Sequence, residues 1–100
     1  MSYNTVSVGT SQSEVVAANT GTPRRIAILL YNNSSTTIYL GDDTSVTTSN
    51  GYPLLNGDEL VIDFRSGIPG FFYRGAIHAI AGSASNDLRY WEMKDVRGTG

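Results

Sequence analysis

Apolar residues come in short runs along the chain, and these runs either alternate with polar residues or are apolar throughout. In ELVIDF (59–64), Leu60, Ile62 and Phe64 fall on one side of an extended chain. RRIAILLY (24–31) is apolar on both sides, which is typical of a central strand. No stretch has the i, i+3, i+4, i+7 apolar spacing of a surface helix. The pattern therefore predicts an all-β protein.

Turn residues separate these runs and set the number of strands. The asparagine-glycine pairs in SNGYP and LNGDE are strong turn signals, and NNSS (32–35) is expected to close a hairpin. Seven or eight short strands at regular spacing predict a single antiparallel β-sandwich or jelly roll, with a small closed barrel as the alternative. The expected strands are 3–8, 13–18, 24–31, 36–40, 59–64, 71–82 and 88–94, and the stretch 45–48 allows an eighth.

The inward-facing apolar positions of these strands form the expected core. One hundred residues are enough for one domain, so we expect a single sandwich over 1–100. Residues 1–12 are a candidate N-terminal arm, and the polar residues 95–100 are expected to form a flexible tail. The predicted core consists of Ile26, Ile28, Leu30, Ile38, Leu40, Leu60, Ile62, Phe64, Ile77, Ala79 and Trp91.

The composition of the chain argues against several classes of binding partner. The net charge of −2 gives no electrostatic reason to bind nucleic acid, and the lack of cysteine excludes disulfides and thiolate metal sites. The apolar runs are too short to cross a bilayer, so we expect no membrane partner. The start, MSYNTVSVGT, lacks the pattern of a signal peptide, which predicts synthesis in a cytoplasm.

No group of residues has the spacing of a catalytic or metal site. His78, the only histidine, lies inside an expected strand, and a general base needs a nucleophile or an orienting group beside it. The acidic pairs Asp42-Asp43 and Asp58-Glu59 lie at strand ends and lack the spaced pattern of a calcium loop. We therefore expect no enzyme activity and no cofactor, with a bound cation at the acidic pairs as the alternative.

Two apolar clusters are candidate interfaces. Three consecutive aromatic residues at 71–73 point to alternate faces of a strand, so one sheet face cannot bury all of them. A second cluster, at 52–55, lies in a turn region. Exposed clusters of this kind mark interaction surfaces, and the alternative is that both fold over the open end of the sandwich. The candidate interface residues are Tyr52, Pro53, Leu54, Phe71, Phe72, Tyr73 and Arg74.

The succession of strands and turns resembles that of small structural proteins of tailed-phage virions. The likeness begins in RRIAILLYNNSSTTIYLGDDTSVTTSNGYPLLNGDELVIDF and continues in FFYRGAIHAIAGSASNDLRYWEM, so that it covers residues 24 to 93. It implies a β-sandwich that decorates or cements a phage capsid, or that forms part of a head fibre or tail appendage. The implied partners are further copies of the chain and a capsid or other virion protein, in a virion assembled in the host cytoplasm. The family has no catalytic residues to carry over.

A second hypothesis is a carbohydrate- or receptor-binding β-sandwich of a tail or head fibre. Tyr31, Tyr39 and Tyr52 could stack on sugar rings while asparagine or aspartate side chains hold the hydroxyls. This hypothesis requires the three tyrosines to be exposed on one concave face.

Overall fold

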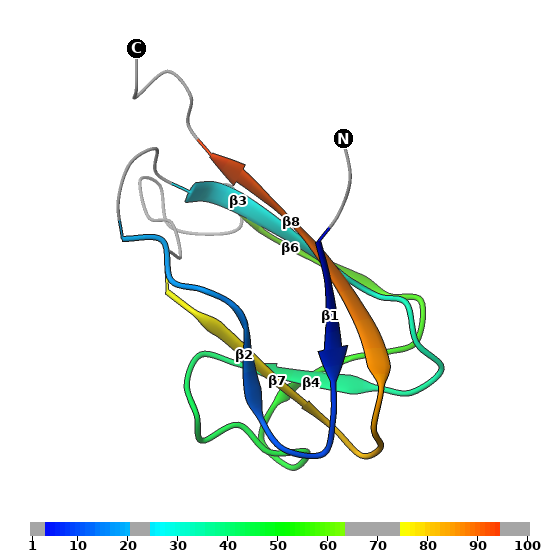
Figure 1. The fold of residues 1–100 in the computed structure, drawn as a ribbon. Helices are drawn as coiled ribbons and strands as arrows, with labels where there is room; N and C mark the ends of the chain where they lie inside the picture. The colour runs from blue at the N-terminus through cyan, green and yellow to red at the C-terminus, as the bar shows by residue number, and fades with distance from the viewer. Residues whose placement is uncertain (1–3, 21–24, 64–74, 95–100) are drawn as a thin grey trace.

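The computed structural model describes residues 4–20, 25–63 and 75–94. This part of the chain is all-β, with no helix, as predicted (Figure 1). Its eight strands are β1 (Asn4–Val8), β2 (Ser13–Val16), β3 (Arg25–Asn32), β4 (Ile38–Gly41), β5 (Tyr52–Leu54), β6 (Glu59–Asp63), β7 (Ile77–Ala81) and β8 (Asn86–Lys94).

The strands form two antiparallel four-stranded sheets, which lie as two layers in Figure 1. Sheet A has the order β1-β8-β3-β6, and sheet B has the order β2-β7-β4-β5. The hydrogen-bonded pairs are nested along the chain, because β1 pairs with β8, β2 with β7, β3 with β6 and β4 with β5. This nesting is the strand order of a jelly roll. Of the predicted alternatives, the described residues thus form a sandwich and not a closed barrel.

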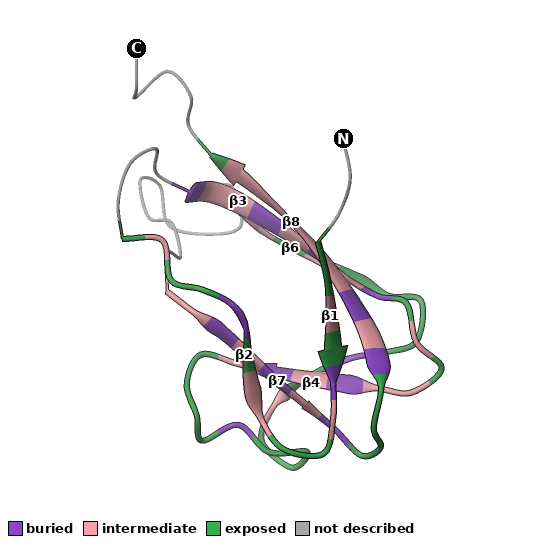
Figure 2. Ribbon diagram, viewed as in Figure 1, coloured by how far each residue is buried: buried purple, intermediate pink, exposed green. Residues whose placement is uncertain are grey.

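The core lies between the sheets, where buried and half-buried positions alternate along β3, β4 and β7 (Figure 2). Six predicted core residues are buried: Ile28, Leu30, Ile38, Leu40, Ile77 and Ala79. Leu60 and Ile62 are partly buried and pack against this cluster. The prediction missed six other members, namely Val8, Val15, Val16, Leu54, Ala81 and Leu88.

Three predicted core residues do not belong to the buried cluster as described. Phe64 lies outside the described residues. Ile26 is half-buried because the register of β3 against β8 shifts between Arg25 and Ala27. Trp91 is half-buried because it pairs with Leu29, whose side of β3 faces away from sheet B.

The NNSS segment does not close a hairpin, because it leads from β3 in sheet A to β4 in sheet B. Its hydrogen bonds fit this crossing. Asn32 is fully buried, and its Nδ2 donates to the carbonyl oxygens of Thr36 and Leu54, each at 2.7 Å. The Asn32 Oδ1 accepts from the backbone N–H of Ser34 at 3.0 Å and from the Ser34 hydroxyl at 2.7 Å. One side chain thus joins the end of sheet A to β5 of sheet B.

A charged side chain joins the sheets at the opposite end of β3. Arg25 is 1% exposed, and its Nε donates to Oε2 of Glu92 at 2.8 Å. Its Nη1 donates to the Gly75 carbonyl at 2.9 Å, and its Nη2 to the Ala17 carbonyl at 2.7 Å. Gly75 and Ala17 adjoin β7 and β2 of sheet B. The hydrogen bonds to Gly75 and Ala17 cross from sheet A to sheet B, so this guanidinium holds the two layers together.

The loop between β4 and β5 covers part of the outer face of sheet B. Val46 in this loop is 5% exposed, although 45–48 is not a strand. A Cβ added at Gly41 would lie 2.7 Å from the Cβ of Val46, and one added at Gly51 would lie 2.9 Å from its Cγ2. The two glycines therefore leave room for Val46 to lie directly on the strand.

Candidate functional site

The predicted interface residues of β5 separate into two groups. Tyr52 is 55% exposed and Pro53 is exposed, whereas Leu54 is 2% exposed. Leu54 is a core residue and the interface assignment was wrong, because it pairs with the buried Ile38 and shares its inward side of the sheet. The other predicted residues, Phe71, Phe72, Tyr73 and Arg74, lie outside the described residues.

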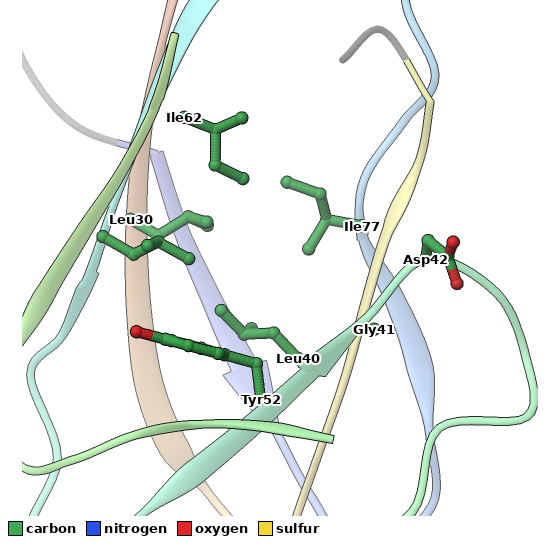
Figure 3. Close-up of a pocket in the computed structure, with 8 residues that line it drawn as sticks. Leu30, Leu40, Gly41, Asp42, Tyr52, Ile62 and Ile77 are labelled. Atoms are coloured by element: carbon green, nitrogen blue, oxygen red, sulfur yellow. The ribbon is translucent and has the colours of Figure 1, made fainter. Parts of the chain in front are cut away.

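Tyr52 lies at the mouth of an apolar groove between the two sheets. It pairs with Leu40 and so lies on the inner side, but β5 is an edge strand, which leaves the ring open to solvent. In Figure 3, Leu30 and Ile62 of sheet A face Leu40 and Ile77 of sheet B across this space, and the carboxylate of Asp42 points away from it. The groove has a volume of about 240 Å³ and is lined by Leu30, Leu40, Gly41, Asp42, Tyr52, Leu60, Ile62 and Ile77.

The outer face of sheet A carries a row of apolar side chains. Val61 on β6, Leu29 on β3 and Trp91 on β8 lie side by side in the strand register, and we call them the apolar row. Val61 is 44% exposed, and Leu29 and Trp91 are half-buried. The outward side of an antiparallel sheet is usually polar when it faces water. An apolar row across three strands is therefore a candidate contact surface.

A row with charged ends lies next to the apolar row on the same face. It consists of Glu59 on β6, Tyr31 on β3 and Arg89 on β8, and we call it the charged row. Glu59 is exposed and has no salt bridge with another described residue. Arg89 is 42% exposed, and its Nη2 lies 3.2 Å from Oδ2 of Asp87. The row thus has a negative end at the sheet edge and a positive end two strands away.

The single histidine lies on the outer face of sheet B, where it contacts a glutamine side chain. The His78 Nδ1 lies 2.9 Å from Oε1 of Gln12, and His78 is opposite Glu14 in the register. Within residues 4–20, 25–63 and 75–94, no three histidine, cysteine, aspartate or glutamate side chains are grouped as metal ligands. In the same ranges, no helix has the length and apolar character needed to cross a membrane.

The acidic pair after β4 orders its own turn. The Asp43 Oδ1 accepts hydrogen bonds from the backbone N–H of Ser45, at 2.9 Å, and from the Ser45 hydroxyl. These bonds hold the pKa of Asp43 below its usual value of 3.8, because they stabilise the charged carboxylate. Such a side-chain-to-backbone bond is common in turns and needs no cation.

The three tyrosines of the sugar-binding hypothesis do not share a face. Tyr31 is on the outer face of sheet A. Tyr39 pairs with Pro53 and Ile80 on the outer face of sheet B, and Tyr52 lies at the groove between the sheets. Their placement does not form one platform for sugar rings.

The sequence contains a signal for the apolar row. RRIAILLY is apolar on both sides, a pattern that is typical both of a central strand and of an apolar outer face. The strand is central, but its outward side also carries Leu29 next to Val61. The neighbours that complete the row depend on strand register, which the run itself does not specify.

Comparisons of the chain with protein-family models, with curated proteins and with solved structures found no match.

Proposed function

We propose that this protein is a non-enzymatic structural protein of a phage virion, which decorates the head shell and associates with further copies of itself there. The apolar row on the outer face of sheet A is the observation that carries the proposal. Val61 is 44% exposed, and apolar surface left in water is unfavourable by about 25 cal/mol for each Å², a penalty that a protein partner removes. A contact surface of this kind suits a protein that associates with further copies of itself on a shell.

The source of the partner follows from the family resemblance. The likeness to small virion proteins spans residues 24–93, which include β3 to β7, all of β8 except Lys94, and all members of the apolar row. Jelly rolls are common in viral capsid proteins but also occur in lectins and enzymes, so the fold agrees with the proposal without selecting it. The resemblance and the outer face of sheet A together favour the shell.

The test is to count copies of the protein in purified virions by quantitative mass spectrometry. Many copies per particle are expected for a shell protein, a handful would indicate a vertex, neck or tail part instead, and no copies would refute the proposal. Particles lacking the protein are then mixed with wild type or with Val61→Asp, which puts a charge into the apolar row. Val61→Asp should bind poorly, because it disrupts the contact between copies that holds the protein on the shell.

A matched variant separates this effect from a general effect of charge. Thr48→Asp places the same carboxylate at an exposed position in the loop that covers sheet B. It should bind particles like wild type. Equal binding by Val61→Asp and wild type would show that assembly on the shell does not depend on the outer face of sheet A.

A further inference from the structure

The apolar row and the charged row on sheet A are arranged symmetrically about β3, so the same surface on a second copy would be complementary to them. In the register, Leu29 lies between Val61 and Trp91, and Tyr31 lies between Glu59 and Arg89. Across β6, β3 and β8, both rows are therefore centred on β3, and β1, with Thr5 beside Arg89, lies outside this centred part. A two-fold axis lying over β3 and parallel to it would exchange β6 with β8 in a facing copy. Glu59 would then meet Arg89 of the second copy, and Val61 would meet Trp91.

We propose that two copies of this chain pair through the outer faces of sheet A, related by a two-fold axis parallel to β3 and passing over Leu29 and Tyr31. The inference deepens the proposed self-association and rests on it. Most symmetric pairs use the same patch on both subunits, so the patch must be self-complementary. The charged row meets this condition, because its acidic end and its basic end exchange places.

The available charges agree with this pairing. Glu59 has no salt bridge among the described residues. The contacts of Arg89 with Asp87, from Nε and Nη2, both go to the same carboxylate oxygen. A guanidinium has five N–H donors, which leaves capacity for a second carboxylate. Stacked sheets lie about 10 Å apart, a gap that a glutamate and an arginine side chain span together.

Other placements of a second copy do not satisfy the same groups. With the axis across the strands at Leu29, the row at Tyr31 would exchange with the row at Ala27. Arg89 would then face Met93 of the second copy, and Glu59 would have no cation opposite it within the described rows. With the axis between β3 and β8, Glu59 would face Thr5. Only the axis along β3 pairs both charges.

The test uses two charge reversals at the ends of the charged row. Sedimentation equilibrium of wild type, from micromolar to millimolar concentration, should give a monomer–dimer equilibrium. Glu59→Arg would place two arginines together at both ends of the interface, and Arg89→Glu would place two glutamates together. Because each change occurs twice in a symmetric pair, each variant alone should weaken association about tenfold or more.

Mixing the two variants is the decisive measurement. Each end of the mixed pair then holds one arginine and one glutamate, so an equimolar mixture should dimerise about as well as wild type. Glu14→Arg changes the net charge as Glu59→Arg does but lies on sheet B, and it should leave the equilibrium unchanged. Circular dichroism should show that every variant stays folded.

The outcomes distinguish this pairing from the proposed function. A wild-type protein that stays monomeric or forms trimers would overturn the inference, as would a mixture that does not recover. If Val61→Asp stops association while the charge variants do not, the face is correct and the axis is wrong. Pairs that form as predicted in a protein absent from virions would refute the function and leave the pairing intact.

Discussion

The outer faces of the two sheets differ in what covers them. On sheet B, the loop after β4 places Val46 against Gly41 and beside Gly51, and Val46 is 5% exposed. On sheet A, Val61 is 44% exposed within the apolar row. The chain thus covers part of one apolar face with its own loop, and no described loop buries Val61 in this way. This difference is why we assign recognition to sheet A and stability to the loop on sheet B.

The largest loss of stability is expected for a substitution between the two sheets, and losses on the outer faces can be compared with it. Ile28 is fully buried between the sheets, and its neighbour Leu29 points to the outer face of sheet A. Ile28→Ala should lower the free energy of unfolding by about 2–4 kcal/mol, because it leaves a cavity. Urea denaturation measures this change. Leu29→Ala should lower stability by less, and equal losses would mean that the two faces of β3 are equally buried.

The next effect concerns the close approach of the loop to sheet B. Gly41→Ala would bring a Cβ to 2.7 Å from the Cβ of Val46, an atom fixed to the backbone. The loop must then lift, and we expect a loss of about 1–3 kcal/mol. Gly82→Ala is the matched control, because an added Cβ there meets no atom within 4 Å. If the control loses as much stability, a general glycine effect and not the loop contact would be responsible.

The outer faces of the two sheets can be compared directly by replacing one valine on each face with alanine. Val46→Ala removes buried methyl groups from the cover of sheet B and should lower stability by about 1–2 kcal/mol. Val61→Ala should change the stability of dilute protein by no more than about 0.5 kcal/mol, because its side chain is partly in water. Denaturation midpoints of both variants give the comparison. A larger loss at Val61 would show that sheet A is covered within one chain.

The sequence predicted the elements better than their neighbours. The core positions predicted for β3 and β4 are correct at Ile28, Leu30 and Ile38, which are buried and lie on the period of a strand. The prediction for Trp91 was wrong. Most residues of β8 are half-buried on both sides of the strand, so the sequence does not indicate which side faces sheet B. A shift of one residue exchanges the two sides, and only the pairing with Leu29 decides it.

The turn residues did not indicate where the chain crosses from one sheet to the other. Polar turn residues such as those after β3 suit a hairpin and a crossing between sheets equally well, and the strand pairing distinguishes them, because β3 and β4 belong to different sheets. Leu54 was assigned to an interface because it belongs to an apolar cluster in a turn-rich region, where a strand of three residues was not recognised. The candidate surface on sheet A was missed for a related reason, since it combines three strands distant in sequence.

The smallest change is expected in the turn at Asp43, which begins the loop between β4 and β5. The bonds from Ser45 lower the pKa of Asp43 in the folded protein, so this contribution to stability is fully present above its unfolded value of 3.8. It is lost as the pH falls below that value and through the lowered folded pKa. In Ser45→Ala, the pKa of Asp43 should return toward 3.8, and titration of the Asp43 carboxyl carbon by NMR measures this directly. Thr44→Ala, at an exposed position in the same turn, should leave the titration unchanged. An Asp43 pKa that stays low in Ser45→Ala would mean that another group, and not Ser45, stabilises the carboxylate.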